Sequence, residues 1–316
     1  MSGLDAQQMQ QLMAMIGQNG AQFAVDQSLI AAAAVGGGTT GGAPIIAPVL
    51  DEFEEGQEIE EYNTYHSKYT RGEAHPDILI QSSAMASVEP PPITYEPTLR
   101  PKVFKENLLS RPQLETVVYA CQSHSMMLPD KKRRRGFFLG DGAGVGKGRQ
   151  IAALFLENWM QGRKKGIWMS ISKDLQHDAR RDLDDVDAAD IPSEALAGDY
   201  GKIQLKEGVL FITYSMLVAK SGKKSRLNQV IRWLGPDFDG LIVFDESHKA
   251  KNLAGRNPTQ MGLAVEELQN KCPNARVVYC SATGASEPAN MCYMERLGMS
   301  CYEFFSSFHS FLPLFT

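Results

Sequence analysis

The sequence predicts an α/β fold: a mainly parallel β-sheet with helices on both faces, preceded by a disordered acidic N-terminal arm. Three observations support this prediction. Short, nearly all-apolar runs alternate with helical stretches between residues 104 and 299, which is typical of strands covered by helices on both faces. A glycine-rich loop containing a lysine joins the first of these runs to a helix. The first 61 residues, by contrast, are acidic or of low complexity.

Residues 1–61 are predicted to form a low-complexity, disordered arm. Residues 1–67 contain nine acids and no Lys or Arg, and seven of these acids lie within residues 51–61. The alanine run 31–34 and the Gly/Thr run 36–42 bury too little apolar surface to offset the entropy of ordering. A short helix at residues 4–16 that binds a partner is the alternative. The rest of the chain carries 28 acids against 32 bases, which is compatible with a polyanionic ligand.

Residues 62–103 are expected to form an extended segment that wraps the surface of the folded unit, because they combine scattered tyrosines with the proline run Pro90–Pro92. The folded unit is predicted to begin near Phe104, with a helix over residues 109–128 that has Pro112 in its first turn. Five consecutive basic residues follow at positions 131–135. They fit a nuclear import signal, a nucleic-acid-binding patch or a solvated loop.

The stretch GFFLGDGAGVGKGRQI, residues 136–151, has the features of a phosphate-binding loop. An apolar strand at residues 137–139 leads into alternating glycines and Lys147, and helical spacing starts at Arg149. Glycines let backbone N–H groups turn toward an anion, the helix N-terminus adds positive charge, and the lysine reaches the outer phosphates. The match to G-x-x-x-x-G-K-[ST] is imperfect, because Asp141 holds the first glycine position and Gly148 the hydroxyl position. A glycine-rich turn without a ligand is the alternative.

Four further strands are predicted downstream, at residues 167–171, 209–214, 241–244 and 277–280, with helical stretches at 175–183, 227–234 and 261–268. Ligands of such sheets bind beyond the carboxyl ends of the strands, and the candidate residues lie at those ends. In the glycine loop the nucleotide-binding candidates are Gly142, Gly144, Val145, Gly146, Lys147, Gly148 and Arg149.

The strand at residues 241–244 runs directly into Asp245, Glu246, Ser247 and His248. We expect Asp245 to hold Mg²⁺, directly or through water, and Glu246 to orient and deprotonate the attacking water. His248 would link the site to neighbouring elements. Lys147, Asp245, Glu246 and His248 are therefore the catalytic candidates. An acidic strand-to-loop exit without chemistry is the alternative.

The strand at residues 277–280 ends in Ser281, Ala282 and Thr283. Their hydroxyls could bond the acidic motif and couple the nucleotide state to a bound strand. Taken in order, GxGKG, DESH and SAT resemble motifs I, II and III of superfamily 2 helicase-like ATPases. The stretches FFLGDGAGVGKGRQIA, IVFDESHKAKN and RVVYCSATGASEPANMCYMERLG resemble the Strawberry Notch family of nuclear transcriptional regulators, with similarity from about residue 62 to about residue 299.

This resemblance implies a RecA-like, P-loop NTPase lobe over residues 104–299 that uses ATP and Mg²⁺. It also implies a nuclear DExH protein that regulates transcription through chromatin, histones or nucleic acid; DNA, RNA and nucleosomes all remain open as partners. Gly148 is usual for the family and leaves the Mg²⁺ shell short of one ligand, which a water or Asp245 would supply. Gln113 is expected against adenine, with a plain helix-surface glutamine as the alternative. The nucleic-acid candidates, otherwise ordinary exposed helix residues, are Ser172, Lys173, Arg180 and Arg181.

The remaining features concern the compartment and the end of the chain. The five cysteines show no C-x-x-C pairing, and no apolar run approaches the ~18–20 residues that span a membrane, so an intracellular, reducing environment is expected. Only 33 residues follow Thr283, too few for the second RecA-like lobe of a helicase-like motor. Residues 300–316 form a divergent aromatic tail. We therefore expect that this chain contains only the first lobe and that its ATP turnover is slow or absent. A nucleotide-binding regulatory scaffold is the alternative to an enzyme.

Overall fold

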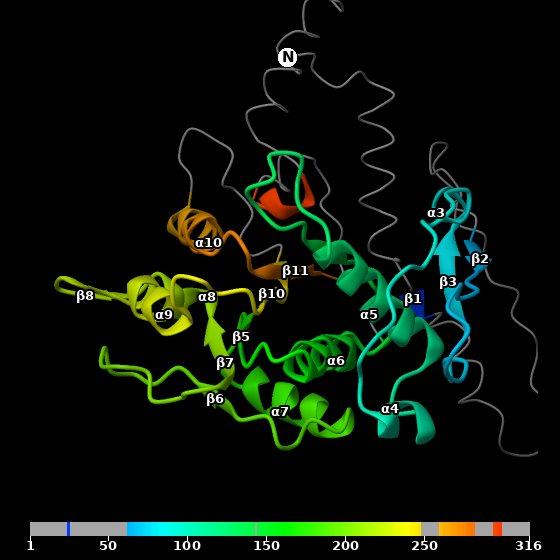
Figure 1. Ribbon diagram of the computed structural model, residues 1–316, viewed down its shortest axis with the longest axis horizontal. Coiled ribbons are helices and arrows are strands. Elements are labelled where there is room, and N and C mark those ends of the chain that lie inside the picture. The colour runs from blue at the N-terminus through cyan, green and yellow to red at the C-terminus, as the bar shows by residue number, and fades with distance from the viewer. Residues whose placement is uncertain (1–23, 26–61, 143, 248–258, 282–292, 299–316) are drawn as a thin grey trace, which may run out of the picture.

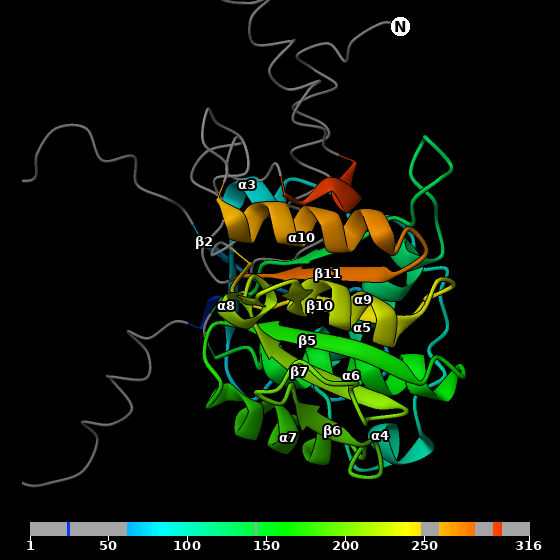
Figure 2. The same ribbon diagram turned by 90° about the vertical axis from the view of Figure 1, so that its left-hand side faces the viewer.

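The computed structural model describes residues 24–25, 62–142, 144–247, 259–281 and 293–298. Its centre is a six-stranded sheet with the strand order β4-β11-β10-β5-β7-β6, and every pairing between these strands is parallel. Figure 2 shows five of these strands stacked in this order from β11 to β6. The strands are β4 (Phe137–Leu139), β5 (Lys165–Ser170), β6 (Ser193–Ala195), β7 (Gly208–Thr213), β10 (Leu241–Phe244) and β11 (Arg276–Cys280). The predicted α/β fold with a parallel sheet is confirmed.

Helices cover both faces of this sheet, as Figure 1 shows. Side chains alternate along each strand: in β5, Trp168 joins the apolar core on one face, while Ile167 and Met169 join the core on the other. The first face carries α5 (Arg111–His124), α6 (Lys147–Met160) and α7 (Leu175–Asp185). The second carries α8 (Tyr214–Leu217), α9 (Arg226–Leu234) and α10 (Gln260–Lys271). Strands buried on both faces explain why their sequences are nearly all apolar.

The predicted helix over residues 109–128 is shorter in the structure, where α5 ends at His124 and Ser125 is its C-cap. Leu128 accordingly lies in the following loop, where its N–H bonds the carbonyl of Arg133. Within the basic run, Arg133 pairs with Asp130 and Glu295, and Arg134 donates to the carbonyls of His124 and Asn274. These two arginines therefore hold the loop in place.

Residues 62–105 contain more regular structure than an extended segment. Strands β2 (Tyr62–Thr64) and β3 (Leu79–Ser82) pair antiparallel, and β3 also pairs with β1 (Ala24–Val25). The short helices are α3 (Ser83–Ala86) and α4 (Pro101–Lys105). Tyr69 and Leu99 belong to the same apolar core as α5 and α6, so the packed unit includes residues before Phe104. The domain boundaries otherwise stay a prediction.

The stretch between α3 and α4 is bonded to the helices α5 and α6. The carboxylate of Glu157, on α6, accepts hydrogen bonds from the Tyr95 hydroxyl and from the backbone N–H and hydroxyl of Thr98. Gln122, on α5, accepts from the N–H of Thr94 and donates to the carbonyl of Pro92. Glu157 is fully buried, so these bonds replace its lost hydration.

A buried arginine ties the last described segment to the sheet. Arg296 lies in the 3₁₀-turn η3 (Glu295–Leu297) and has no exposed surface. Its guanidinium donates to the carbonyls of Gln269, Cys272 and Pro273, at 2.7, 2.7 and 2.8 Å, where α10 ends. A cation at this end of a helix satisfies carbonyls that have no partner within the helix. The Arg296 carbonyl in turn accepts the N–H of Gly136, just before β4.

Within the described residues, no helix has the length and apolar character needed to cross a bilayer. Cys121, Cys272 and Cys280 are buried free thiols. The predicted arm, apart from Ala24 and Val25, and the tail 300–316 lie outside the described residues.

Candidate nucleotide-binding site

The glycine loop joins the end of β4 to the start of α6. Gly144 and Gly146 have φ angles of 91° and 88°, in the left-handed region that favours glycine. A Cβ at Gly146 would also overlap the Nε2 atom of Gln113. Gly146 is the N-cap of α6, so this turn aims the loop backbone and the positive end of a 14-residue helix at one place.

Lys147 is the first residue of α6, and its side chain folds back over the loop. Its Nζ donates to the carbonyls of Asp141 and Gly142, at 2.9 and 3.0 Å. The structure thus places the ammonium beside the loop and the helix N-terminus, where the sequence predicted the phosphate-binding lysine. Anions bind at such a point because backbone N–H groups, helix dipole and lysine act together.

Gln113 contacts the glycine loop directly. Its Nε2 donates to the carbonyl of Val145 at 2.8 Å, and its Oε1 accepts the N–H of Ser110 at 2.9 Å as part of the capping box of α5. Val145 is fully buried. Gln113 therefore fastens the start of α5 to the phosphate loop, and it is not a plain surface glutamine. Its contact with adenine stays a prediction.

Asp141 lies buried beneath the loop, at the position that usually holds the first glycine. Its Oδ2 accepts a hydrogen bond of 2.7 Å from Nε2 of Gln150, on α6. Its Oδ1 and the Oε1 of Gln150 have no hydrogen-bond partner among the described residues. Burial raises the pKa of Asp141 to about 8, against the lowering effects of Gln150 and Lys147. The loop therefore contains a buried carboxyl whose raised pKa favours its neutral form at pH 7.

Asp245 and Glu246 follow β10, as predicted. The carboxylate of Asp245 accepts the Ser170 hydroxyl at 3.2 Å and the N–H of Glu246 at 3.0 Å. The Tyr214 hydroxyl, 2.8 Å from the Asp245 carbonyl, fixes the backbone there. Burial, followed by the charge of Glu246, raises the pKa of Asp245. Glu246 has a φ of 49°, a left-handed conformation that costs free energy in a residue other than glycine and is often found at functional sites.

The three motifs meet at the carboxyl ends of the strands, because β4, β11 and β10 are adjacent and parallel. Ser281, directly after β11, is buried, and its N–H donates to the carbonyl of Leu139 at the end of β4. Motifs that are far apart in the sequence therefore lie close together in the structure. His248, Ala282 and Thr283 lie outside the described residues.

The nucleic-acid candidates are placed less uniformly. Arg180 donates to the carbonyls of Ala188 and Ile191 and pairs with Asp184, so its guanidinium holds the turn after α7. Arg181 pairs with Asp178 on the helix surface. Ser172 and Lys173 lie between β5 and α7, and Lys173 is exposed.

Arg149 and Gly148, both predicted to contact nucleotide, lie against α7. Arg149 pairs with Asp185 at 2.9 Å, and Gly148 adjoins Asp182.

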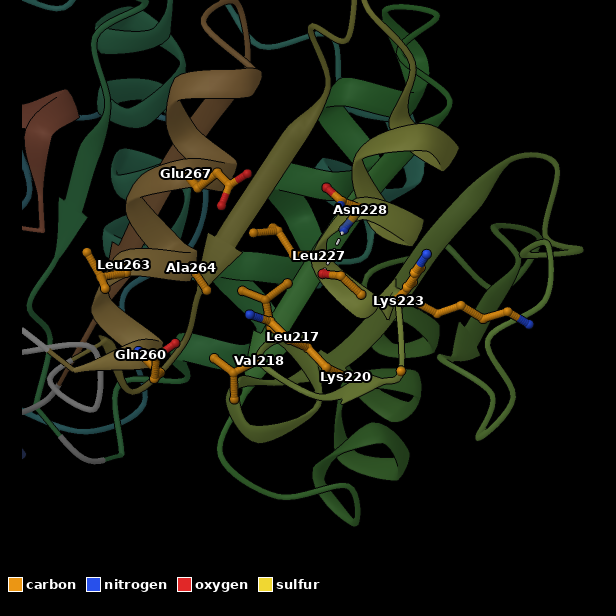
Figure 3. Close-up of a pocket in the computed structure, with 13 residues that line it drawn as sticks. Leu217, Val218, Lys220, Lys223, Leu227, Asn228, Gln260, Leu263, Ala264 and Glu267 are labelled. Carbon is orange, nitrogen blue, oxygen red and sulfur yellow. Dashed lines mark hydrogen bonds between the residues drawn. The ribbon is translucent and has the colours of Figure 1, made fainter.

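A cavity of about 430 Å³ lies on the other helical face. Leu217 of α8, Leu227 of α9 and Ala264 of α10 converge on its centre, and Lys223 extends outward from it (Figure 3). None of its lining residues belongs to the candidate site.

Comparisons with known proteins agree with the motifs. A family model described as "P-loop containing NTP hydrolase pore-1" matches residues 74–315. The chain is 49% identical over 274 residues to Protein FORGETTER 1 of Arabidopsis thaliana, covering 83% of this chain and 21% of that protein. It is 48% identical over 275 residues to Protein strawberry notch homolog 1 of Rattus norvegicus, covering 80% and 22%. The chain thus spans about a fifth of the length of the curated relatives it matches.

Among solved structures, the SWI2/SNF2 ATPase core of Sulfolobus solfataricus in complex with dsDNA is 20% identical, with a TM-score of 0.47 over 69% of this chain and 40% of that chain.

Proposed function

Since the chain belongs to the Strawberry Notch family of P-loop NTP hydrolases, we propose that it binds ATP at the glycine loop and hydrolyses it with the help of Mg²⁺. The observation that carries this proposal is the position of Lys147. Its Nζ lies over the loop carbonyls, at the N-terminus of α6. Asp245 and Glu246 lie at the same carboxyl end of the sheet, following β10, which is two strands from β4.

The residues present suit a magnesium ion. Asp245 offers a carboxylate with a raised pKa, and a bound cation would favour its charged form. Among the described residues, no group of three or more His, Cys, Asp or Glu side chains could hold a metal alone, which fits an ion that also takes oxygens from phosphate and water. When bound, Mg²⁺ neutralises charge on the phosphates. Asp245 would hold it, and Lys147 would exchange its loop carbonyls for phosphate oxygens.

Hydrolysis then assigns a role to Glu246. A water oxygen forms a bond to the γ-phosphorus while the bond from that phosphorus to the β,γ-bridging oxygen breaks. ADP leaves with the electron pair, and the Glu246 carboxylate accepts the proton of the water. Glu246 follows Asp245 directly, and the Asp245 backbone is held by Tyr214 and by the carbonyl of Met169.

A second candidate function is a nucleotide-binding regulatory scaffold without turnover. The position of Lys147 over the loop carbonyls supports it equally, because this position bears on phosphate binding and not on turnover. In P-loop NTPases an arginine supplied across the site can be worth about 10³–10⁵ in rate, and we propose that a second lobe provides it in the longer relatives.

We also propose that the protein acts in the nucleus on nucleic acid or chromatin and so regulates transcription. The excess of bases over acids after residue 67 supports a polyanionic partner. Lys173, exposed beside the start of α7, is the nucleic-acid candidate best placed to contact it.

The test is binding of a fluorescent ATP analogue to the full chain with Mg²⁺ present. Lys147→Ala should weaken binding at least about tenfold, since it removes a charge-assisted phosphate contact. The control Lys220→Ala removes an exposed lysine of the short strand β8 (Lys220–Ser221), outside the candidate site, and should bind like the wild type. Equal binding by Lys147→Ala, or no binding by folded wild type, would refute the proposal.

A further inference from the structure

Gly148 stands where a phosphate loop usually carries a Ser or Thr, and another side chain fills the space. A Cβ built on Gly148 would overlap Oδ2 of Asp182 and lie 2.8 Å from its Cγ and 3.3 Å from its Oδ1. The hydroxyl oxygen of a Ser or Thr would be bonded to that Cβ. The carboxylate of Asp182, on α7, therefore fills the space that a Ser or Thr side chain would need at this position.

The packing of α7 on α6 holds Asp182 in this position. Ala179 and Leu183 bury their side chains in the same core as Ile151 of α6. The ion pair between Arg149 and Asp185 joins the two helices one residue beyond Gly148. Asp182 thus lies between a buried contact and a salt bridge, and its backbone position is defined from both sides.

The bonding of Asp182 differs from that of the other acids of α7. Asp178, Asp184 and Asp185 each pair with an arginine. Asp182 makes no hydrogen bond or ion pair with another described residue, and burial raises its pKa. The charges of Arg181 and Arg149 partly offset this rise of the pKa. A carboxylate beside a phosphate-binding loop would still repel the phosphates unless a cation lies between them.

We propose that Asp182 takes the place of the usual P-loop hydroxyl as an oxygen ligand of the nucleotide-bound Mg²⁺. Mg²⁺ in nucleotide sites is held by one or two carboxylates together with phosphate oxygens and water, and Asp182 would be one of these carboxylates. This inference rests on the proposed function, because it concerns the same site. It replaces the expectation that a water or Asp245 alone makes up for Gly148.

The experiment measures how much Mg²⁺ strengthens nucleotide binding. Affinity of the full chain for a fluorescent ADP analogue is titrated with Mg²⁺ and, separately, with EDTA. Asp182→Asn should reduce the ratio of the two affinities at least about tenfold, because even loss of a partner that only supports a metal ligand typically costs this much. It should leave the affinity in EDTA unchanged. The control Asp178→Asn, one turn away on the same helix, should keep the full ratio. Circular dichroism verifies that both variants are folded.

A ligand exchange makes the test specific. The double variant Asp182→Ala with Gly148→Ser moves the oxygen from α7 to α6, and it should regain most of the Mg²⁺ effect that Asp182→Ala loses. Electron paramagnetic resonance of Mn²⁺ added with ADP should likewise report weaker metal binding for Asp182→Asn.

An unchanged ratio in Asp182→Asn, or an equal loss in Asp178→Asn, would overturn the inference. So would wild type that binds ADP equally with Mg²⁺ and EDTA, although the proposed nucleotide site would then stand. Loss of nucleotide binding by wild type under both conditions would refute the two together.

Discussion

Replacing Asp141 by asparagine should remove a pH dependence from the stability of the fold. The carboxyl is fully buried, and burial raises its pKa from 3.8 to about 8. Between these two values the folded chain keeps a proton that the unfolded chain has released. The free energy of unfolding therefore falls as the pH rises through this window, and the effect ends above the folded pKa.

The size of the effect follows from the shift. One pKa unit corresponds to about 1.4 kcal/mol. From pH 6 to pH 8 the slope is nearly full at first and flattens as the folded carboxyl begins to ionise, so wild type should lose about 2 kcal/mol. Asparagine has nearly the same shape, keeps an oxygen to accept the Nε2 of Gln150, and does not ionise. The free energy of unfolding of Asp141→Asn should therefore not show this loss between pH 6 and pH 8.

Urea unfolding followed by tryptophan fluorescence at pH 6 and pH 8 provides the measurement. Trp168 and Trp233 are both buried, so their emission reports unfolding. For each protein, the change in the free energy of unfolding from pH 6 to pH 8 is determined. The difference in this change between wild type and Asp141→Asn is decisive, because the other groups titrate equally in both. Asp174→Asn, at an exposed position, should behave like wild type. Parallel pH profiles for wild type and Asp141→Asn would show that the carboxyl is ionised in the folded chain and refute the reasoning.

Two further predictions concern turnover and packing. Glu246→Gln should bind the ATP analogue like wild type but lose hydrolysis stimulated by DNA or RNA, measured as phosphate release; wild type that is no faster than this variant would favour the scaffold function. Glu157→Ala should lower the free energy of unfolding by about 3 kcal/mol, because it leaves the Tyr95 hydroxyl and the Thr98 N–H without their buried acceptor. Urea unfolding checks this against Glu194→Ala, at an exposed position of β6, and equal losses in the two variants would contradict it.

The parts of the fold that could be predicted are those in which local pattern and tertiary environment agree. Strands Phe137–Leu139 and Leu241–Phe244 have the predicted bounds, because all their residues are apolar and buried. Strand β6, Ser193–Ala195, was not predicted. It lies at the edge of the sheet, pairs with β7 on one side and is partly exposed, so its sequence lacks the apolar pattern of the others.

The same distinction applies to the site. Lys147 and Asp245 could be located because each depends on its immediate neighbours in the sequence: a turn that opens a helix, and the end of a strand. Asp182 and Gln150 could not, because their importance arises from contacts between elements that only the packing of α6 establishes. The direction of a long side chain is equally hidden. Arg180 is a nucleic-acid candidate in the sequence, and the structure adds that its guanidinium bonds carbonyls of its own turn.

The strand order has a consequence for how the protein is made. Strand β4, which carries the phosphate loop, stands at the edge of the sheet beside β11, the last strand among the described residues. During synthesis, β4 can pair with its neighbour only after residues 276–280 have been made. The N–H of Gly136 can find its acceptor, the carbonyl of Arg296, only after residue 296 has been made. Domains fold as units during synthesis, and here the candidate nucleotide site, although encoded early, is completed only when nearly all of the described residues have been translated.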